Sequence, residues 1–533
     1  MHPSTLAKRV FFLLLLAIFA FYFYGLGFFP LVGPDEPRYA QVAREMFLRG
    51  DLVTPTLGGH TWFEKPALLY WMMIAAFKLF GVHEWSARLG PAICGLLTVA
   101  AVWFVGRQVE RTSLLSEAVD LGFWSALVCA SSLGLIVFSR GASFDIVITM
   151  TSAWALGLFI SAEMSVERRR QIGFLAGFYC FVGLSLLGKG LVGLVIPFGV
   201  VGLYYLIRRA WPDRTVWLSL VWGIPLAVLV ALMWYGPVIY RNGWLFIDEF
   251  FIQHHFARYV SNKYHHPQPL YFYPAILLML LVPWSPILID SLVRAKNWQW
   301  RDGDSLDRIL VFALAWVAMP VVFFSFSGSK LPGYILPVIP AASILIGSRL
   351  GHSKLSLKLT AALCVLMGIV GLVYLARGEK LPIAYSVAAA IPFVIGGVLA
   401  LFLKRSSAIL TIATAVFGTI VVVLNCVAPV IAQRESTRQL LMEADALGYS
   451  KLLVLALRSD DRSAEFYANG RVVYDPNGQL ITIDEVPMMI AVIRERGEKI
   501  LAFIPSEEID RFIDEPGIEV IGDNGKQVLI CIY

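Results

Sequence analysis

Apolar runs of about 20 residues recur along this chain between residue 9 and about residue 431, and no other feature of the sequence constrains its fold as strongly. A helix of that length crosses roughly 30 Å of hydrocarbon. The chain is 58% hydrophobic and 15% charged, far from the balance of a soluble globular protein. The pattern predicts a polytopic α-helical membrane protein with about thirteen transmembrane helices, near residues 10–29, 86–106, 119–139, 144–164, 171–188, 191–207, 216–236, 270–290, 308–326, 332–349, 357–376, 383–403 and 407–431.

The first apolar run, Val10 to Phe29, follows Lys8 and Arg9 in the way that a secretory signal does. It is longer than the core of a signal peptide, lacks a small-residue cleavage site and is followed by further spans. We therefore expect it to be retained as the first transmembrane helix.

Basic residues occupy alternate connections between the predicted spans, and cytoplasmic loops of membrane proteins carry such an excess of Lys and Arg. The basic groups are Lys8/Arg9, Arg107/Arg111, Arg168 to Arg170, Arg208/Arg209/Arg214, Arg294/Lys296/Arg301, Arg349/Lys354/Lys358 and Lys404/Arg405. The N-terminus is therefore expected in the cytoplasm. The net charge of +6 reflects this topology, because the last hundred residues or so are acidic, and it does not indicate a nucleic-acid partner.

Two long connections on the opposite, outer side are expected to have structure of their own. Residues 30–85 are too apolar for a floppy linker, and Pro37 and Pro66 open stretches that predict surface helices up to Leu48 and Phe80. Residues 237–269 form a second outer loop that ends in a polar, His-bearing stretch, and its length suggests a functional loop.

Residues 434–533 lack apolar runs of membrane length and alternate strand-like with helical patterns. Strands are expected at 452–457, 500–504 and 528–532, and helices at 437–447 and near 485–496. The sequence thus predicts a transmembrane domain over residues 1–433 and a small periplasmic α/β domain over residues 434–533. The six cysteines are scattered singly and indicate neither a metal site nor a disulfide.

Ionisable residues near the predicted spans gather on the outer side, although chance would scatter them over both sides. Asp35 and Glu36 follow the first span in the segment GPDEPRY, and either carboxylate could act as a general base. An equally good interpretation is that Asp35 caps a helix that starts at Pro37.

Lysines accompany these carboxylates on the outer side. Lys65, next to Glu64, could bind a lipid-linked phosphate as a point charge or form a surface ion pair. Lys330 and Tyr334 lie at an outer helix start, whose amides favour anions, so they suit a phosphate as well as a lipid headgroup.

Two further charges are expected at outer helix ends next to lipid. Asp145 should face a protein cavity or pair with Arg140. Lys189 should extend to the headgroups or join the same cavity. Four histidines could hold a divalent metal together with Glu64, although no single helical spacing unites them: His254, His255, His265 and His266.

Several common catalytic motifs are missing from the sequence. It contains no P-loop, no GxGxxG that opens a helix after a strand, no GxSxG and no HExxH. Nucleotide-driven chemistry and serine hydrolysis are therefore both disfavoured.

A set of segments, taken in order, resembles the GT-C superfamily of membrane glycosyltransferases, which use polyprenyl-phosphate sugars. The segments are GPDEPRYAQVAREM, TWFEKPALLYW followed by FGVHEWSARL, SRGASFD, LLGKGLVG, HHFARY and SKLPGYILPVIPA. Within the superfamily the chain most resembles the bacterial transferases that move 4-amino-4-deoxy-L-arabinose from undecaprenyl phosphate to lipid A, which are relatives of the protein O-mannosyltransferases. The resemblance implies thirteen spans and a periplasmic C-terminal domain.

The resemblance also implies roles for residues at matching positions. Asp35 is the implied catalytic carboxylate, with Glu36 and Asp145 as further acidic candidates. The donor phosphate is assigned to Lys65, Lys330, Tyr334, Arg258 and Arg38, and the rest of the cavity to Tyr39, Trp62, Glu64, His255, His265 and Lys189. A divalent metal is left open, with Glu64, His255 and His265 as candidate ligands, because His254 replaces the Glu that relatives usually carry before that histidine.

The implied function is transfer of a sugar from undecaprenyl phosphate to an envelope acceptor on the periplasmic face of the bacterial inner membrane, most directly aminoarabinose to lipid A. Transfer of mannose or galacturonic acid to protein or glycan is the alternative within the class. A transporter of lipid-linked sugar is the alternative from another class, but transporters place their charges near the midplane between repeats. The expected partners are the sugar donor, a lipid or glycan acceptor and membrane lipid.

Overall fold

The computed structural model describes residues 5–112, 120–257, 268–301, 303–457, 462–476, 478–512 and 516–533. For residues 5–13, 255–257, 483, 489 and 496 it describes the backbone alone. The chain forms two compact units. Unit 1 comprises Met1–Tyr24, Glu64–Leu69 and Gly90–Val422, and unit 2 comprises Gly25–Phe63, Tyr70–Leu89 and Val423–Tyr533.

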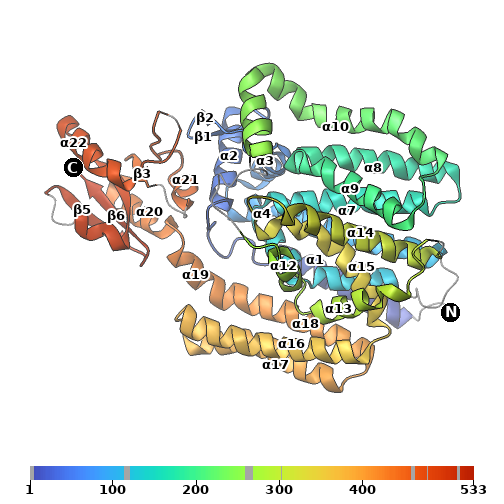
Figure 1. The fold of residues 1–533 in the computed structure, drawn as a ribbon. Coiled ribbons are helices and arrows are strands. Elements are labelled where there is room, and N and C mark those ends of the chain that lie inside the picture. The colour runs from blue at the N-terminus through green and yellow to red at the C-terminus, as the bar shows by residue number, and fades with distance from the viewer. Residues whose placement is uncertain are drawn as a thin grey trace. The chain divides into compact units, whose positions relative to one another are not determined.

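Unit 1 is helical, and most of its helices are labelled in Figure 1. Apolar sequence of span length explains them, because a backbone in lipid must satisfy its hydrogen bonds internally. The helices are α1 (Thr5–Phe23), α4 (Glu84–Thr112) from Gly90 onward, α5 (Leu121–Ala130), α6 (Leu133–Ser139), α7 (Phe144–Glu163), α8 (Arg168–Lys189), α9 (Val192–Arg208), α10 (Arg214–Phe246), η2 (Ile247–Ala257), α12 (Phe272–Leu280), α13 (Ser285–Arg294), η3 (Ala295–Asn297), α14 (Ser305–Ser325), η4 (Pro332–Val338), α15 (Ile339–Leu350), α16 (Lys354–Val373), η5 (Tyr374–Gly378), α17 (Ile383–Phe402) and α18 (Arg405–Val422).

Within the described residues, nine helices are long and apolar enough to cross a membrane, or up to eleven if each of two bent pairs is one span. The bent pairs are α5 with α6, at 59°, and α12 with α13, at 120°. Three shorter apolar helices accompany them, at Leu14–Phe23, Leu68–Phe80 and Val192–Arg208. The prediction of a polytopic helical membrane protein is therefore confirmed, whereas the count of thirteen spans stays a prediction.

Two segments differ from the sequence-based expectation. The outer loop expected from residue 237 is helical at its start, because α10 continues through Pro237 and bends only at Gly243, where φ is 54°. The segment then continues as the π-helical η2. The single span expected at 270–290 is instead the pair of helices bent by 120°.

Helices α7 and α8 pack against each other in unit 1 as neighbours joined by a short connection (Figure 1). Ser143 begins α7 by accepting a hydrogen bond from the Asp145 N–H at 3.1 Å, as an N-cap residue does. Gly190, with φ of 70°, ends α8 directly after Lys189. Because a helical hairpin is antiparallel, the first turn of α7 and the last turn of α8 lie at the same end.

Unit 2 combines the segment after α1 with the C-terminal part of the chain. Its first part holds α2 (Glu36–Arg49), a short hairpin of β1 (Thr56–Leu57) and β2 (His60–Thr61), and most of α3 (Leu68–Phe80). Its second part consists of η6 (Val423–Val427), α19 (Ala428–Arg434), α20 (Arg438–Ala444), η7 (Asp445–Tyr449), β3 (Val454–Ala456), α21 (Ser463–Tyr467), η8 (Ile483–Glu485), α22 (Val486–Arg496), β4 (Ile500–Pro505), η9 (Ser506–Arg511), β5 (Ile518–Asp523) and β6 (Gln527–Ile532).

The strands β3 to β6 form one mixed sheet in the order β3-β4-β6-β5. β3 pairs in parallel with β4, and β6 pairs antiparallel with β4 and β5. Successive side chains of a strand point to opposite faces, so Ile500, Ala502 and Ile504 pack on one face with α22. Leu501 and Phe503 pack on the other face with α20 and α21. The sheet is thus covered on both faces, as the prediction of a small α/β region requires.

Most elements of unit 2 were predictable from the sequence. α2 and α3 match the two predicted surface helices, and Gly50 and Gly81, with φ of 64° and 86°, follow their last turns. The strands β3, β4 and β6 and the helices α20 and α22 also occur as predicted. The sequence analysis missed β5 and α21. The predicted domain boundary at residue 434 stays a prediction.

Candidate functional site

In unit 1, the shared end of α7 and α8 brings Asp145 and Lys189 together. The Lys189 ammonium forms an ion pair with Asp145, and both side chains are mostly buried. Arg140, the other partner considered for Asp145, donates instead to the main-chain oxygens of Phe21 and Tyr24. Lys189 therefore does not extend to solvent but lies within the protein.

A third element joins this pair through the predicted segment SKLPGY. Lys189 Nζ lies 4.7 Å from the centroid of the Tyr334 ring, within the range of a cation–π contact. The Gly333 backbone lies directly against the Asp145 carboxylate. A Cβ atom at position 333 would lie 2.1 Å from Asp145 Oδ2. Only glycine allows this close approach. The segment is thus fixed against the α7–α8 hairpin.

Lys330 completes what we call the lysine cluster, defined as Asp145, Lys189, Lys330 and Tyr334. Its side chain is 8% exposed, and its ammonium donates to the main-chain oxygen of Gln268 at 2.8 Å. The described partner of this ammonium is a neutral carbonyl and not a carboxylate. The cluster therefore carries two lysines against one carboxylate, which favours an anionic ligand.

Glu64 and Lys65 also belong to unit 1. The Lys65 ammonium lies 2.8 Å from Glu64 Oε1, and the two side chains are 14% and 9% exposed. The expected ion pair between these neighbours is present. It is not a solvated surface pair, because both partners are largely shielded from water.

In unit 2, Asp35 lies at the N-cap position of α2 but makes no capping hydrogen bond with its side chain. The carboxylate instead pairs with Arg38, one turn later in the helix. The Asp35 side chain is 54% exposed, whereas that of Arg38 is 13% exposed. The Asp35 side chain therefore does not cap α2, and its catalytic role stays a prediction.

Glu36 has a different environment from its neighbour. Arg88 holds the Glu36 carboxylate with two contacts of 2.7 and 2.8 Å and is itself fully buried. The same guanidinium donates to the main-chain oxygens of Leu26, Phe29 and Pro30. Glu36 thus acts as a structural anchor for the segment before α2, and the geometry disfavours it as a general base.

Aromatic residues surround Arg38 in unit 2. The guanidinium carbon of Arg38 lies 5.3 Å from the ring centroids of both Tyr39 and Trp62. Trp62 Nε1 is buried and makes no hydrogen bond to a described residue. The predicted cavity residues Tyr39 and Trp62 therefore do lie beside the Asp35–Arg38 pair.

Four residues considered for the site cannot be placed. Arg258 and His265 lie outside the described residues, as does His266, and the side chain of His255 is not described. Among described side chains, no group of three or more His, Cys, Asp or Glu is placed to hold a metal ion. The metal candidates Glu64, His255 and His265 therefore stay predictions.

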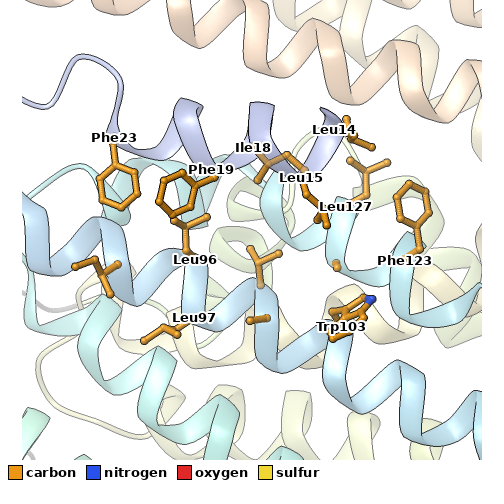
Figure 2. Close-up of a pocket in the computed structure, with 14 residues that line it drawn as sticks. Leu14, Leu15, Ile18, Phe19, Phe23, Leu96, Leu97, Trp103, Phe123 and Leu127 are labelled. Carbon is orange, nitrogen blue, oxygen red and sulfur yellow. The ribbon is translucent and has the colours of Figure 1, made fainter. Parts of the chain in front are cut away.

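Unit 1 also contains a groove between α1, α4 and α5 with a volume of about 460 Å³ (Figure 2). Its walls are hydrocarbon and aromatic, with Phe19 and Phe23 from α1, Leu97 and Trp103 from α4 and Phe123 from α5. A phosphate would lose its hydration there without a compensating charge. The groove suits the hydrocarbon part of a lipid.

The sequence analysis missed two charged residues of unit 2, Glu84 and Arg88. Both lie in the segment FGVHEWSARL, which contributed to the family resemblance without a role for either residue. Their spacing of four residues on one helix predicts a shared face. Sequence spacing gave no sign that the partner of Arg88 is Glu36, 52 residues earlier.

Comparison with known proteins gives matches in sequence and in fold. Residues 8–242 match the family described as dolichyl-phosphate-mannose-protein mannosyltransferase. The undecaprenyl phosphate-α-4-amino-4-deoxy-L-arabinose arabinosyl transferase of Pseudomonas aeruginosa is 30% identical over 350 residues, which is 64% of this chain and 60% of that protein. The enzyme of the same name from Serratia proteamaculans is 29% identical over 345 residues, which is 64% of this chain and 59% of that protein. The matched part thus spans about 60% of the length of these relatives.

The fold match extends further along the chain than the sequence match. The crystal structure of ArnT from Cupriavidus metallidurans bound to undecaprenyl phosphate has a TM-score of 0.81 and 22% identity, and covers 99% of this chain and 98% of its own. The resemblance predicted from the motifs is confirmed: the chain is similar in sequence to the undecaprenyl phosphate-aminoarabinose arabinosyl transferases over 64% of its length, and it shares the fold of ArnT.

Proposed function

We propose that this chain transfers a sugar from undecaprenyl phosphate to an acceptor of the bacterial envelope, and that the sugar is aminoarabinose and the acceptor lipid A. The relatives' names support the donor and the sugar. The ArnT crystal structure that shares this fold was determined with undecaprenyl phosphate bound, which supports a lipid-phosphate donor.

The observation that carries the proposal is the lysine cluster. Departure of the sugar from the donor leaves negative charge on the phosphate, and preorganised cations in a site with little water stabilise that charge most effectively. Lys330 and Lys189 supply the cations, and Tyr334 supplies a hydroxyl donor. Lys65, and Arg258 by resemblance, are further phosphate ligands in this proposal.

Asp35 is assigned to the acceptor. Its carboxylate is about half exposed and is oriented by Arg38, so it can accept a proton from a hydroxyl or position an acceptor at the sugar's anomeric carbon. A lipid A phosphate is already ionised at neutral pH, so with that acceptor Asp35 positions rather than deprotonates. The bond from the anomeric carbon to the donor phosphate breaks as the bond to the acceptor oxygen forms.

The orientation in the membrane is part of the proposal. Arg168 to Arg170 lie at the start of α8, at the opposite end from Lys189. The positive-inside rule therefore assigns the lysine cluster to the periplasm. By the same rule, the basic residues at the start of α1 and of α18 assign the N-terminus to the cytoplasm and residues 434–533 to the periplasm. Alkaline phosphatase fused after residue 533 should be active, and an inactive fusion with full expression would reverse the assignment.

The test uses the full-length protein in proteoliposomes with labelled undecaprenyl-phosphate aminoarabinose. Acceptor-dependent release of undecaprenyl phosphate, with the label recovered on lipid A, is expected. Movement of the sugar-lipid across the bilayer without cleavage would instead indicate a transporter. Release without added acceptor would indicate hydrolysis.

A second candidate follows from the match of residues 8–242 to a protein mannosyltransferase family. Its acceptor would be a protein hydroxyl rather than a lipid phosphate. With a hydroxyl acceptor, Asp35 is needed as a general base. Offering the same proteoliposomes a Ser/Thr peptide in place of lipid A separates the two candidates.

A further inference from the structure

The C-terminal region, residues 434–533, contacts the segment that carries Asp35 within unit 2. The Leu31 N–H donates to the Tyr467 hydroxyl at 2.7 Å, and Leu31 lies four residues before Asp35. The same hydroxyl donates to Glu84 Oε1 at 2.9 Å, and Arg438 approaches that oxygen at 3.2 Å. Tyr467 is thus held in place by its own partners while it fixes the backbone before α2.

A second contact reaches the partner of Asp35. The guanidinium carbons of Arg38 and Arg462 lie 5.3 and 5.9 Å from the ring centroid of Trp62, so both guanidinium groups make cation–π contacts with the same indole ring. Each cation has its own carboxylate, since Arg38 pairs with Asp35 and Arg462 pairs with Glu465. Mutual repulsion between the two guanidinium groups is thereby reduced.

Arg462 is itself rigidly placed. Its guanidinium contacts the two carboxylate oxygens of Glu465 at 2.7 and 2.8 Å, and Glu465 is buried. The Tyr474 hydroxyl also donates to Glu465, at 2.9 Å. The contact from Arg462 Nη2 is a hydrogen bond and the contact from Nε is a close ion-pair contact, so together they restrict the orientation of the guanidinium. Trp62 therefore rests against a fixed surface of the C-terminal region.

We propose that Arg462 and Tyr467 are positioning residues for Asp35, so that the C-terminal region is a working part of the transfer site. This role rests on the proposed function. Tyr467 fixes the backbone before Asp35, and Arg462 acts through Trp62 on Arg38, which orients the carboxylate. A displacement of about 1 Å at a reacting group can cost on the order of 100-fold in rate. Loss of either contact should therefore reduce turnover without removing a ligand of the donor.

The first test measures position directly and needs no activity. Hydrogen exchange of peptides covering residues 30–40 should accelerate in Tyr467→Phe, because the Leu31 N–H loses its partner, and in Arg462→Ala. Arg511→Ala is the matched control, since Arg511 lies in the same region with exposed partners, Glu508 and Asp484. Unchanged exchange in both test variants would overturn the proposal.

The second test measures transfer by the same full-length variants in proteoliposomes. Arg462→Ala should lower kcat about 10-fold or more and change the donor KM less than about twofold, and Arg462→Lys should recover part of the loss. In a Trp62→Leu background the effect of Arg462→Ala should disappear, because coupled residues are not additive. Additive effects, or a loss expressed in donor KM alone, would contradict a positioning role.

The two tests separate the two proposals. If the wild-type protein transfers no sugar while residues 30–40 still loosen in both variants, the proposed function fails and the anchoring contact stands. If wild-type transfer is robust and neither kcat nor exchange responds, the proposed function stands and the positioning role is wrong.

Discussion

Near the candidate site, carboxylates are held by arginines in unit 2 and by lysines in unit 1, although Arg208 and Arg349 hold Glu163 and Asp290 elsewhere in unit 1. In unit 2, Arg88 binds Glu36 and Arg462 binds Glu465, each through two contacts, and both arginines are wholly or largely buried. In unit 1, Lys189 pairs with Asp145 and Lys65 with Glu64. A guanidinium fixes a carboxylate in one geometry, whereas an ammonium is a compact charge that can turn toward another anion.

This difference suggests a division of work. The arginine pairs of unit 2 fasten segments that are far apart in the sequence, as Arg88 does for the backbone from Leu26 to Glu36. The lysine cluster of unit 1 has one more positive than negative side chain, and this excess charge favours binding of a phosphate. Changes in the first set should therefore reduce stability, and changes in the second set should reduce donor binding.

The largest effect is expected for Arg88→Met. Breaking a buried ion pair by removing one partner costs about 3–5 kcal/mol, and here three carbonyl contacts are lost as well. Thermal unfolding of the purified protein in detergent measures the loss. Arg170→Met is the control, because its pair with Glu167 is exposed and should contribute less than about 1 kcal/mol. A stable but inactive Arg88 variant would contradict the proposal that the arginine pairs of unit 2 serve stability and the lysine cluster serves donor binding.

Asp35→Asn should have the next largest effect, and on activity rather than stability. Asp35 lies in unit 2, but its pair with Arg38 is partly open to solvent. We expect transfer to a hydroxyl acceptor to fall by about 100-fold or more, since loss of a general base has that size of effect, and transfer to lipid A, for which Asp35 only positions the acceptor, to fall less. Transfer rates in proteoliposomes measure it, with Glu508→Gln as an exposed control. Full activity of the Asp35 variant would remove the carboxylate from the mechanism.

Much of the membrane part was predictable because lipid imposes a strong rule on sequence. Apolar length alone located the segments around α4, α7, α8 and α14 within a few residues. The same rule could not locate bends. The break of 120° between α12 and α13 leaves the composition of the segment unchanged, so only three-dimensional packing reveals it.

The sequence predicted which residues belong to the candidate site, but not which of them contact one another. Asp145, Lys189, Lys330 and Tyr334 were each recognised as charges or hydroxyls at outer helix ends. Hydropathy does not show which of them touch, and the alternative pairing of Asp145 with Arg140 was equally open. The contacts of Tyr467 were beyond sequence reasoning, because α21 is only five residues long and carries no usable periodicity.

Lys330→Met and Lys189→Met probe the lysine cluster. A charge-assisted hydrogen bond contributes about 1.5–3 kcal/mol, so removing one phosphate ligand should raise the donor KM about 10- to 100-fold. Lys330→Met should act through KM with a nearly unchanged melting temperature. Lys189→Met should also destabilise the protein, because it leaves Asp145 unpaired, and Asp145→Asn added to it should restore stability without restoring donor affinity. An unchanged donor KM in both lysine variants would place the phosphate elsewhere.

The smallest effect concerns the dependence of stability on pH in unit 2. Burial raises the pKa of the Glu465 carboxyl above its ordinary value, although Arg462 opposes part of that shift. The folded protein therefore keeps a proton on Glu465 at a pH where the unfolded chain has lost it. This contribution to stability is complete below the pKa of the unfolded chain and is lost as the pH rises through the raised pKa, with a slope of at most about 1.4 kcal/mol per pH unit. Glu465→Gln cannot titrate, so the difference in melting temperature between wild type and variant should change across that window and be constant above it. A constant difference throughout would mean that the pair with Arg462 cancels the effect of burial, and a change of the opposite sign would mean that the pair outweighs burial.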